Sequence, residues 1–273
     1  MIVPKDKYLD IDGLRLHYMD WGNENAQPMI LLHGLQDCAR SWDSFAHGLS
    51  SDYRVLALDH RGHGDSDWAS KDRYRLCDYV TDISALVAEL GLVNVVVVGH
   101  SAGGRNAFEY ALSSPSNVEA LVIVDIDPDA NNEESKDMFA QYYKEGDEWD
   151  CLDDVVDRLR SRQPSSSEEM LFHQASNMTL ELPNGRRVWK RDRTLLTSYE
   201  RPDLWYDWYR IICPLLIVRG RQSKLLTQQV AVKMRESVAR ARLVELEGGG
   251  HWFYQERPEE FEATVRWFLE AIL

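Results

Sequence analysis

The segment VVVVGHSAGG, residues 95–104, carries the strongest structural signal in the chain. Four valines without polar alternation are typical of a strand buried on both faces, and the small residues after them indicate a tight turn into a helix. Ser101 lies at that turn between Gly99 and Gly103, which leave room for a strained backbone. The segment therefore predicts a strand, a sharp turn and a helix, with a serine presented at the carboxyl end of the strand.

Short apolar runs recur on both sides of this unit and alternate with longer helical patterns. The runs occupy residues 29–32, 55–58, 93–98, 121–124, 215–218 and 243–246. Because most are rich in Val, Ile or Leu and lack polar alternation, we expect a mostly parallel sheet covered by helices. The stretch YLDIDGLRLHYMDWG, residues 8–22, alternates around an Asp-Gly turn and predicts an antiparallel hairpin at the sheet edge.

The pattern changes between residues 127 and 212, where charged and aromatic helical stretches such as DMFAQYYKEGDEW, DDVVDRLRSR and LWYDWYRII replace the apolar runs. We interpret residues 127–212 as an inserted helical cap and residues 1–126 and 213–273 as one core. PSSSEE at residues 164–169 has the Ser-then-Glu arrangement of a helix start.

Composition excludes several classes of function. With 273 residues, 44% of them apolar, the chain is long enough for one large core with an insertion. The net charge of −14 argues against nucleic-acid and anionic-membrane partners, which need a basic surface. Four scattered cysteines lack the spacing of a zinc site and are expected to be free thiols. Without a signal sequence or a long apolar run, we expect a cytoplasmic protein, either a monomer or a homodimer.

Two further segments would complete a nucleophilic site around Ser101. The chain turns at His-Gly after the run 29–32, which would place the Leu35 N–H beside the Ala102 N–H as an oxyanion hole. His251 follows three glycines after the last apolar run, and these would allow a loop to place its imidazole over the serine as a general base. Each segment alone has a plainer interpretation, as a tight turn or as a structural histidine. Their order along the chain favours catalysis.

The motifs LLHG, DHRGHGDS, GHSAGG, VDIDP and GGGHW occur in the order typical of the α/β-hydrolase superfamily. Over nearly its whole length the chain resembles the cap-bearing serine hydrolase branch. The resemblance implies a mostly parallel eight-stranded α/β-hydrolase sheet flanked by helices, a triad in the order Ser, acid, His, and no metal or organic cofactor. Related dehalogenases and epoxide hydrolases carry an aspartate at the turn, so Ser101 argues against alkyl halides and epoxides as substrates.

The acid of the triad is missing from its commonest place in this family. That place is the loop after the strand 215–218, where this chain has Ser223, and no Asp or Glu occurs at positions 208–235. Some members of the superfamily instead carry the acid after the strand that follows the nucleophile helix, where this chain has Asp125. We predict Asp125 as the acid and Asp127 as the second candidate, and a site without a functional acid stays open.

These residues predict a carboxylesterase-like serine hydrolase that cleaves a small carboxylic ester or related acyl compound through an acyl-enzyme. The alternatives are an amide or carbon–carbon bond hydrolase acting on a carboxylated substrate, a ligand sensor without turnover, and a cofactor-free haloperoxidase-like side activity. Arg105 and Trp252 are candidate substrate-binding residues, although Arg105 would equally bridge the helix to the cap. The basic segment GRRVWKRDR, residues 185–193, would either line the pocket or form a solvated face.

Overall fold

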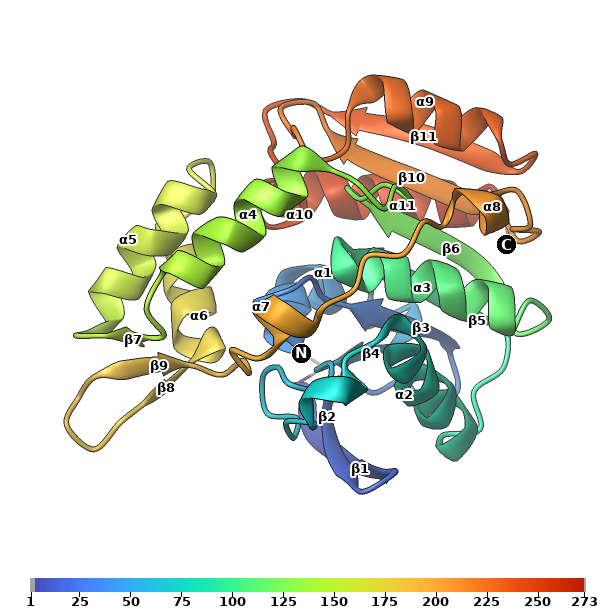
Figure 1. The fold of residues 1–273 in the computed structure, drawn as a ribbon. Helices are drawn as coiled ribbons and strands as arrows, with labels where there is room; N and C mark the ends of the chain where they lie inside the picture. Colours follow the sequence, from blue (N-terminus) through green and yellow to red (C-terminus); the bar gives the residue numbers. More distant parts are fainter. Residues whose placement is uncertain (1–2, 273) are drawn as a thin grey trace.

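The computed structural model describes residues 3–272, which form an eight-stranded sheet in the order β1-β2-β4-β3-β5-β6-β10-β11 (Figure 1). Only the β1–β2 and β2–β4 pairs among these are antiparallel. The mostly parallel sheet is confirmed. The strands are β1 (Lys5–Ile11), β2 (Leu14–Asp20), β3 (Gln27–Leu32), β4 (Tyr53–Leu58), β5 (Val95–His100), β6 (Val118–Val124), β10 (Leu215–Gly220) and β11 (Ala241–Leu246).

The hairpin at the sheet edge is also confirmed. Strands β1 and β2 are joined by Asp12 and Gly13, whose φ values of 49° and 79° suit a tight two-residue turn. One strand differs from its apolar run, because β5 begins at Val95 rather than at residue 93. Asn94 has a φ of 54°, so the turn before the strand ends there.

Helices cover both faces of the sheet (Figure 1). Val95 and Val97 of β5 pack in the cluster that includes residues of α2, α3 and α9, whereas Val96 and Val98 pack with α1 and α11. All four valines are completely buried, which explains the absence of polar alternation in this strand. The covering helices are α1 (Asp43–Leu49), α2 (Leu76–Glu89), α3 (Ala102–Ser113), α9 (Gln228–Glu236) and α11 (Pro258–Glu270).

Residues 127–212, which we call the cap segment, connect β6 to β10, and the part between residues 133 and 189 extends to the left of the sheet in Figure 1. Its α6 begins after Ser167, whose hydroxyl accepts the N–H of Met170, as expected for PSSSEE. Its helices are α4 (Glu133–Lys144), α5 (Leu152–Arg162), α6 (Glu168–Met178), α7 (Leu195–Ser198) and α8 (Trp205–Trp208).

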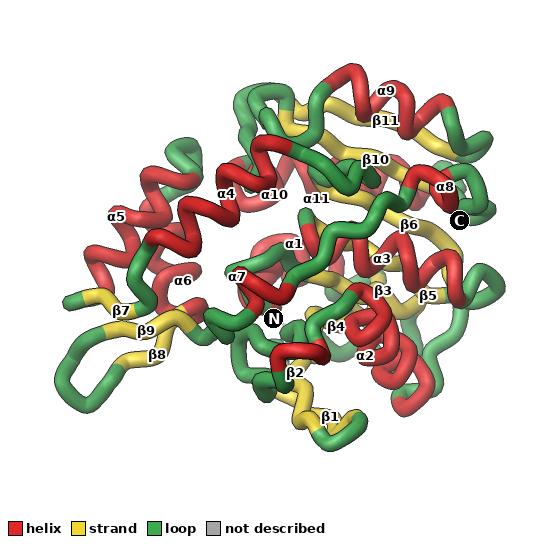
Figure 2. Tube along the Cα trace, viewed as in Figure 1, coloured by secondary structure: helices red, strands yellow, loops and turns green. Residues whose placement is uncertain are grey.

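The cap segment also contains a small antiparallel sheet that the sequence analysis did not predict (Figure 2). It joins β7 (Glu148–Trp149), β8 (Thr179–Glu181) and β9 (Arg187–Trp189) in the order β7-β9-β8. Strands of two or three residues are too short to show periodicity. In the stretch LWYDWYRII, only the four residues of α8 are helical, so the prediction of a longer helix there is wrong.

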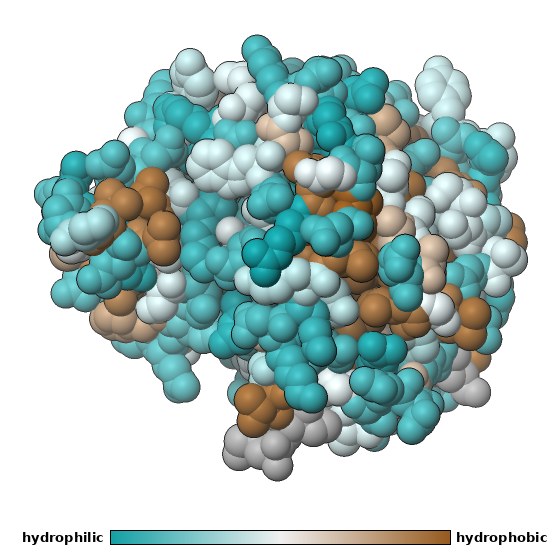
Figure 3. Space-filling model, turned by 90° about the horizontal axis from the view of Figure 1, so that it is seen from below, coloured by the Kyte–Doolittle hydropathy of each residue, from teal (hydrophilic) through white to brown (hydrophobic). Residues whose placement is uncertain are grey.

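Seen from below, hydrophilic side chains occupy most of the surface and apolar side chains gather in limited areas (Figure 3). Within residues 3–272, none of the helices combines the length and the apolar character needed to cross a bilayer.

Candidate active site

Ser101 lies in the sharp turn between β5 and α3 with a φ of 52°. A positive φ is rare for a residue with a side chain and marks local backbone strain. Helix α3 starts immediately afterwards at Ala102, and the first N–H groups of a helix have no acceptor inside it. The turn therefore presents a serine and unsatisfied backbone donors at the same edge of the sheet.

Gly103 permits this turn because β3 runs directly against it. A Cβ at position 103 would lie 2.3 Å from the Leu32 carbonyl oxygen and 2.5 Å from that of His33. Gly103→Ala is therefore expected to lower the free energy of unfolding by roughly 1–3 kcal/mol, measured by urea denaturation. Gly146→Ala is the control, since its nearest neighbour would be 3.9 Å away. Equal effects of the two substitutions would contradict the steric explanation.

The structure brings His251 and Asp125 together. The His251 Nδ1 lies 2.7 Å from the Asp125 Oδ2, although the residues come from separate loops at the carboxyl edge of the sheet. Asp125 directly follows β6, is fully buried, and has a φ of 49°, a second strained backbone beside that of Ser101. Ser101 and His251 line the same cavity. An acid in contact with a histidine, and a serine in the wall of the same cavity, are two of the features that a catalytic triad needs.

The loop without an acid supplies donors to Asp125 instead. The Ser223 hydroxyl donates to the Asp125 Oδ2, which is also the oxygen nearest His251. The N–H of Gly220 donates to the Oδ1 at 3.2 Å. Both contacts favour the ionised carboxylate and hold its orientation.

Asp127, the second candidate acid, faces a different set of partners. Its carboxylate forms an ion pair with Arg201 and accepts hydrogen bonds from the side chain of Asn132 and, at 2.9 Å, from the N–H of Asp129. These contacts lie at the start of the cap segment. The structure therefore places Asp125, and not Asp127, against the histidine ring.

Burial disfavours charge on both members of the His251–Asp125 pair. It raises the pKa of Asp125, and the hydroxyl of Ser223 and the N–H of Gly220 oppose that rise. It lowers the pKa of His251, and the guanidinium group of Arg162 adds to that effect. A neutral imidazole that donates its Nδ1–H to Asp125 keeps its Nε2 lone pair free to accept a proton.

The pH dependence of turnover follows from this environment. Burial, then Arg162 and Arg201, lower the His251 pKa, whereas Asp37 raises it. The base therefore stays neutral at lower pH than usual, and kcat/KM for a neutral ester should fall only below pH 6.5, the ordinary histidine value. Arg162→Gln should move that midpoint upward. A midpoint that does not move in Arg162→Gln would contradict the electrostatic effect of Arg162 on His251.

Leu35 and Ala102, the predicted oxyanion-hole residues, both line the cavity that contains Ser101. The turn before Leu35 is fastened through His33, whose Nε2 accepts the N–H of His60 at 3.0 Å. The structure thus brings the two predicted donors to one cavity wall.

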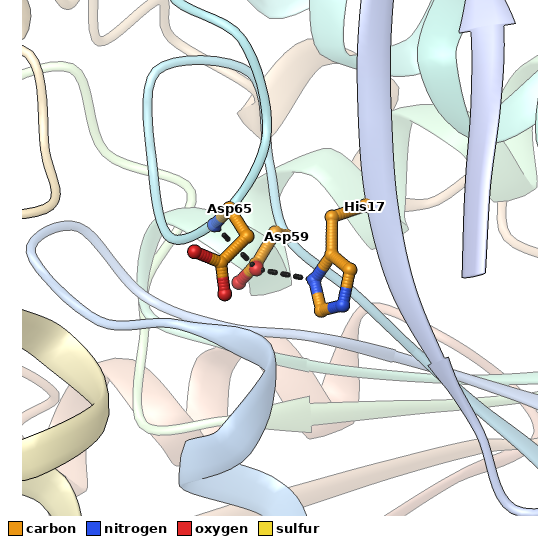
Figure 4. Close-up of side chains that lie close together, drawn as sticks. All are labelled: His17, Asp59 and Asp65. Atoms are coloured by element: carbon orange, nitrogen blue, oxygen red, sulfur yellow. Dashed lines mark hydrogen bonds and ion pairs between the residues drawn. The ribbon is translucent and has the colours of Figure 1, made fainter. Parts of the chain in front are cut away.

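His17, Asp59 and Asp65 lie close together next to this turn, and Figure 4 shows them converging. The Asp59 Oδ2 lies 2.7 Å from the His17 Nδ1 and accepts the Asp65 N–H at 2.9 Å, while its Oδ1 accepts the N–H of Ala39. The carboxylate is thus already occupied by groups of the protein. The cluster connects the DHRGHGDS loop to β2 through His17 and Asp59. It also adjoins the turn before Leu35, because the Asp59 carboxylate lies 3.9 Å from the His33 ring.

Arg105 is 2% exposed and is engaged by the backbone of the cap segment. Its guanidinium donates to the carbonyl groups of Asp127 at 2.7 Å, Asp129 at 3.4 Å and Pro202. This geometry does not support the prediction that Arg105 binds a substrate and favours the alternative, a bridge to the cap. Trp252, the other predicted contact, lines the cavity, and its ring centroid lies 4.8 Å from that of His251.

Two cavities meet beside His251. The one over Ser101 has a volume of about 20 Å³, little more than one water molecule occupies. The wider one, about 520 Å³, lies between the cap segment and the core, and Arg158, Arg162 and Lys224 contribute to its wall. Both cavities are lined by Met138, Tyr142, Leu225, His251 and Trp252.

The basic segment 185–193 is largely engaged in ion pairs within the cap segment. Arg186 pairs with Glu148, and Arg191 and Arg193 both pair with Asp147. The arginines in the wall of the wider cavity are instead Arg158 and Arg162 of α5, neither of which was predicted from the sequence. The amphipathic stretch DDVVDRLRSR does not reveal which of its arginines faces inward.

Comparisons with known proteins support the fold described above. A model of the alpha/beta hydrolase fold matches residues 27–258. An esterase of Mycobacterium tuberculosis is 28% identical, over 92% of this chain and 85% of its own. The 2-(acetamidomethylene)succinate hydrolase of Mesorhizobium japonicum is 25% identical, over 96% and 94% of the two chains.

A solved structure shows the same fold. The crystal structure of E-2-(acetamidomethylene)succinate hydrolase aligns with a TM-score of 0.91 at 24% identity, covering 98% of this chain and 100% of that one. The relatives named esterase and hydrolase support hydrolysis as the general activity. Because the family model spans most of the sequence, this chain belongs to the alpha/beta hydrolase fold family.

Proposed function

We propose that this protein is a serine hydrolase that cleaves a small carboxylic ester or a related acyl compound through an acyl-enzyme. Ser101 is the nucleophile, His251 the general base and Asp125 the acid that orients the histidine. The observation that carries this proposal is the 2.7 Å contact between the His251 Nδ1 and the Asp125 Oδ2, beside a serine with a strained backbone.

In the first step the Ser101 Oγ attacks the substrate carbonyl carbon while the His251 Nε2 takes its proton. The N–H groups of Leu35 and Ala102 stabilise the negative charge on the carbonyl oxygen. Collapse of this intermediate breaks the bond to the leaving group, which receives the proton from His251. Water then repeats the sequence on the acyl-enzyme, releasing the acid and regenerating the serine.

The Asp125 carboxylate has two roles in this scheme. It keeps the Nδ1–H of His251 pointing away from the serine, and it stabilises the imidazolium that forms when the proton moves. Ser223 and Gly220 hold the carboxylate in place for both. The contact of Asp125 with His251 supports turnover over a ligand sensor without turnover, the alternative that the missing acid after β10 indicates.

The names of the relatives support hydrolysis of a carbonyl compound, either an ester or another acyl compound. One is an esterase, and another is a hydrolase of 2-(acetamidomethylene)succinate, and both align over most of this chain. Ester hydrolysis is the function we propose first, because esters require the least activation of the leaving group. Amide hydrolysis by the same residues is the second candidate.

The test combines labelling with turnover. The protein should hydrolyse a short p-nitrophenyl ester and bind one fluorophosphonate per chain on Ser101, located by peptide mass spectrometry. The anilide of the same acyl group, assayed in parallel, distinguishes ester from amide preference. Failure of both the labelling and the turnover would reject a serine hydrolase.

A further inference from the structure

Arg162 ends α5 with part of its guanidinium group buried and unsatisfied. Its Nε and Nη2 atoms are buried and have no hydrogen-bond partner within residues 3–272. No carboxylate in that described range pairs with it, whereas Arg158 of the same helix pairs with Glu145 at 2.7 Å. Arg162 is therefore an uncompensated positive charge in the wall of the wider cavity.

Tyr142 of α4 presents a second unsatisfied polar atom to the same cavity. Its side chain is 2% exposed, and its hydroxyl is buried without a partner among the described residues. Tyr142 and Arg162 both line the wider cavity. Burial raises the pKa of Tyr142, and the charge and side chain of Arg162 oppose that rise. A hydroxyl donor and a guanidinium fork on one wall form a set of donors suited to an anion.

The two residues adjoin the reacting groups. The Arg162 guanidinium lies 4.5 Å from the centroid of the Trp252 ring, and Trp252 neighbours His251 in sequence and in space. Tyr142 lines both the cavity over Ser101 and the wider one. A ligand held by Arg162 and Tyr142 would therefore extend toward the nucleophile.

The energetics favour a single small anion. Burying a charged group without a partner is costly, and the cation–π contact with Trp252 offsets only part of that cost. An incoming carboxylate would supply the missing partner. The exposed side of the cavity carries Glu134 and Asp137 beside Lys224, so a ligand with several negative charges would meet repulsion there.

We propose that Arg162 and Tyr142 bind a free carboxylate of the substrate while Ser101 attacks its acyl carbon. The substrate class is then a monoester of a dicarboxylic acid, or another acyl compound that carries one free carboxylate. This inference rests on the serine-hydrolase function proposed above and names the substrate class of that site.

The experiment compares mono-p-nitrophenyl glutarate with its neutral methyl ester. Both release the same chromophore, and they differ in the charge of the distal group. The unsubstituted protein should prefer the carboxylate in kcat/KM, and Arg162→Gln should reduce kcat/KM for the carboxylate probe by about 10- to 100-fold. The same substitution should change kcat/KM for the methyl ester less than about threefold at a pH on the plateau of the pH profile.

Three variants sharpen this comparison. Arg160→Gln is the matched control, because Arg160 lies on the same helix but pairs on the exposed face with Asp157 and Glu168, and both probes should be unaffected. Tyr142→Phe should reduce turnover of the carboxylate probe by about 3- to 10-fold. Arg162→Lys keeps the charge, so its kcat/KM for the carboxylate probe should lie between those of the unsubstituted protein and Arg162→Gln. It also provides a test if the glutamine variant does not fold.

A binding measurement separates the two proposals. Glutarate should bind the Ser101→Ala protein in a calorimetric titration and should lose most of its affinity when Arg162→Gln is added. Binding without turnover in the unsubstituted protein would reject the serine hydrolase and keep the carboxylate site. Equal losses for both esters, or glutarate binding that does not depend on Arg162, would overturn the carboxylate site.

Discussion

Ser101→Ala is expected to reduce ester turnover by about 10⁴-fold or more, to the level of the uncatalysed reaction plus any residual contribution of the oxyanion hole. The substitution removes the only atom of the proposed site that forms a bond to the substrate. It leaves the turn intact, because alanine occupies less space than serine. Rates with a short p-nitrophenyl ester, together with a far-ultraviolet circular dichroism spectrum, provide the measurement.

His251→Ala should give a loss similar to that of Ser101→Ala, since a nucleophile without its base is almost inert. The double variant should then be little worse than either single one, because residues that act as a unit show non-additive losses. Fluorophosphonate labelling should disappear in Ser101→Ala. Activity above a few per cent in that variant, after exclusion of contaminating esterases, would reject the mechanism.

Asp125→Asn has the second largest expected effect, a decrease in kcat of about 10²- to 10⁴-fold. The side-chain NH₂ of the introduced asparagine would donate a hydrogen bond to the His251 Nδ1, whereas the carboxylate of Asp125 accepts one from it. This change favours the imidazole tautomer whose proton is on Nε2. Such an imidazole cannot accept the proton of Ser101. The imidazolium would also lose its negative neighbour. Steady-state kinetics at the pH optimum, combined with thermal unfolding, separates this loss from a loss of fold.

Asp127→Asn is the matched control, since it makes the same chemical change two residues away. Its carboxylate pairs with Arg201 at the base of the cap segment, so we expect a decrease in kcat of less than about tenfold and a larger change in stability. Ser223→Ala should reduce kcat less than Asp125→Asn does, because it removes only one of the donors that orient the Asp125 carboxylate. If Asp127→Asn were the more damaging of the two aspartate substitutions in kcat, the acid would be misassigned.

Much of the fold was predictable because its strands are fully buried. Runs such as Val95–Val98 have no polar residues, since both of their faces pack against helices, and this leaves a clear pattern in the sequence. The Asp12-Gly13 turn was equally clear, because few residues accept a positive φ. The small sheet of the cap segment left no such pattern, because strands of two or three residues are too short for a repeating apolar face.

The site shows the same contrast. Ser101 and His251 sit in glycine-rich turns whose composition follows from backbone geometry, so they were identifiable from the sequence. The contact of Ser223 with Asp125 joins residues 98 positions apart, and only the tertiary fold brings them together. Arg162 could not be identified from the sequence, because its proposed role rests on two guanidinium nitrogens that have no partner among residues 3–272. Arg105 was wrongly predicted to bind substrate, because only the structure shows that its guanidinium donates to the backbone of the cap segment.

The contacts of Arg105 have a mechanical consequence for the cap segment. The buried Arg105 side chain on α3 binds both ends of the cap segment. It donates to the carbonyl groups of Asp127 and Asp129 near the start of the segment and of Pro202 near its end. These hydrogen bonds hold the two ends of the cap segment to each other and to α3. We therefore expect any motion that admits a substrate to arise in the parts of the cap segment farther from Arg105, beginning with α4.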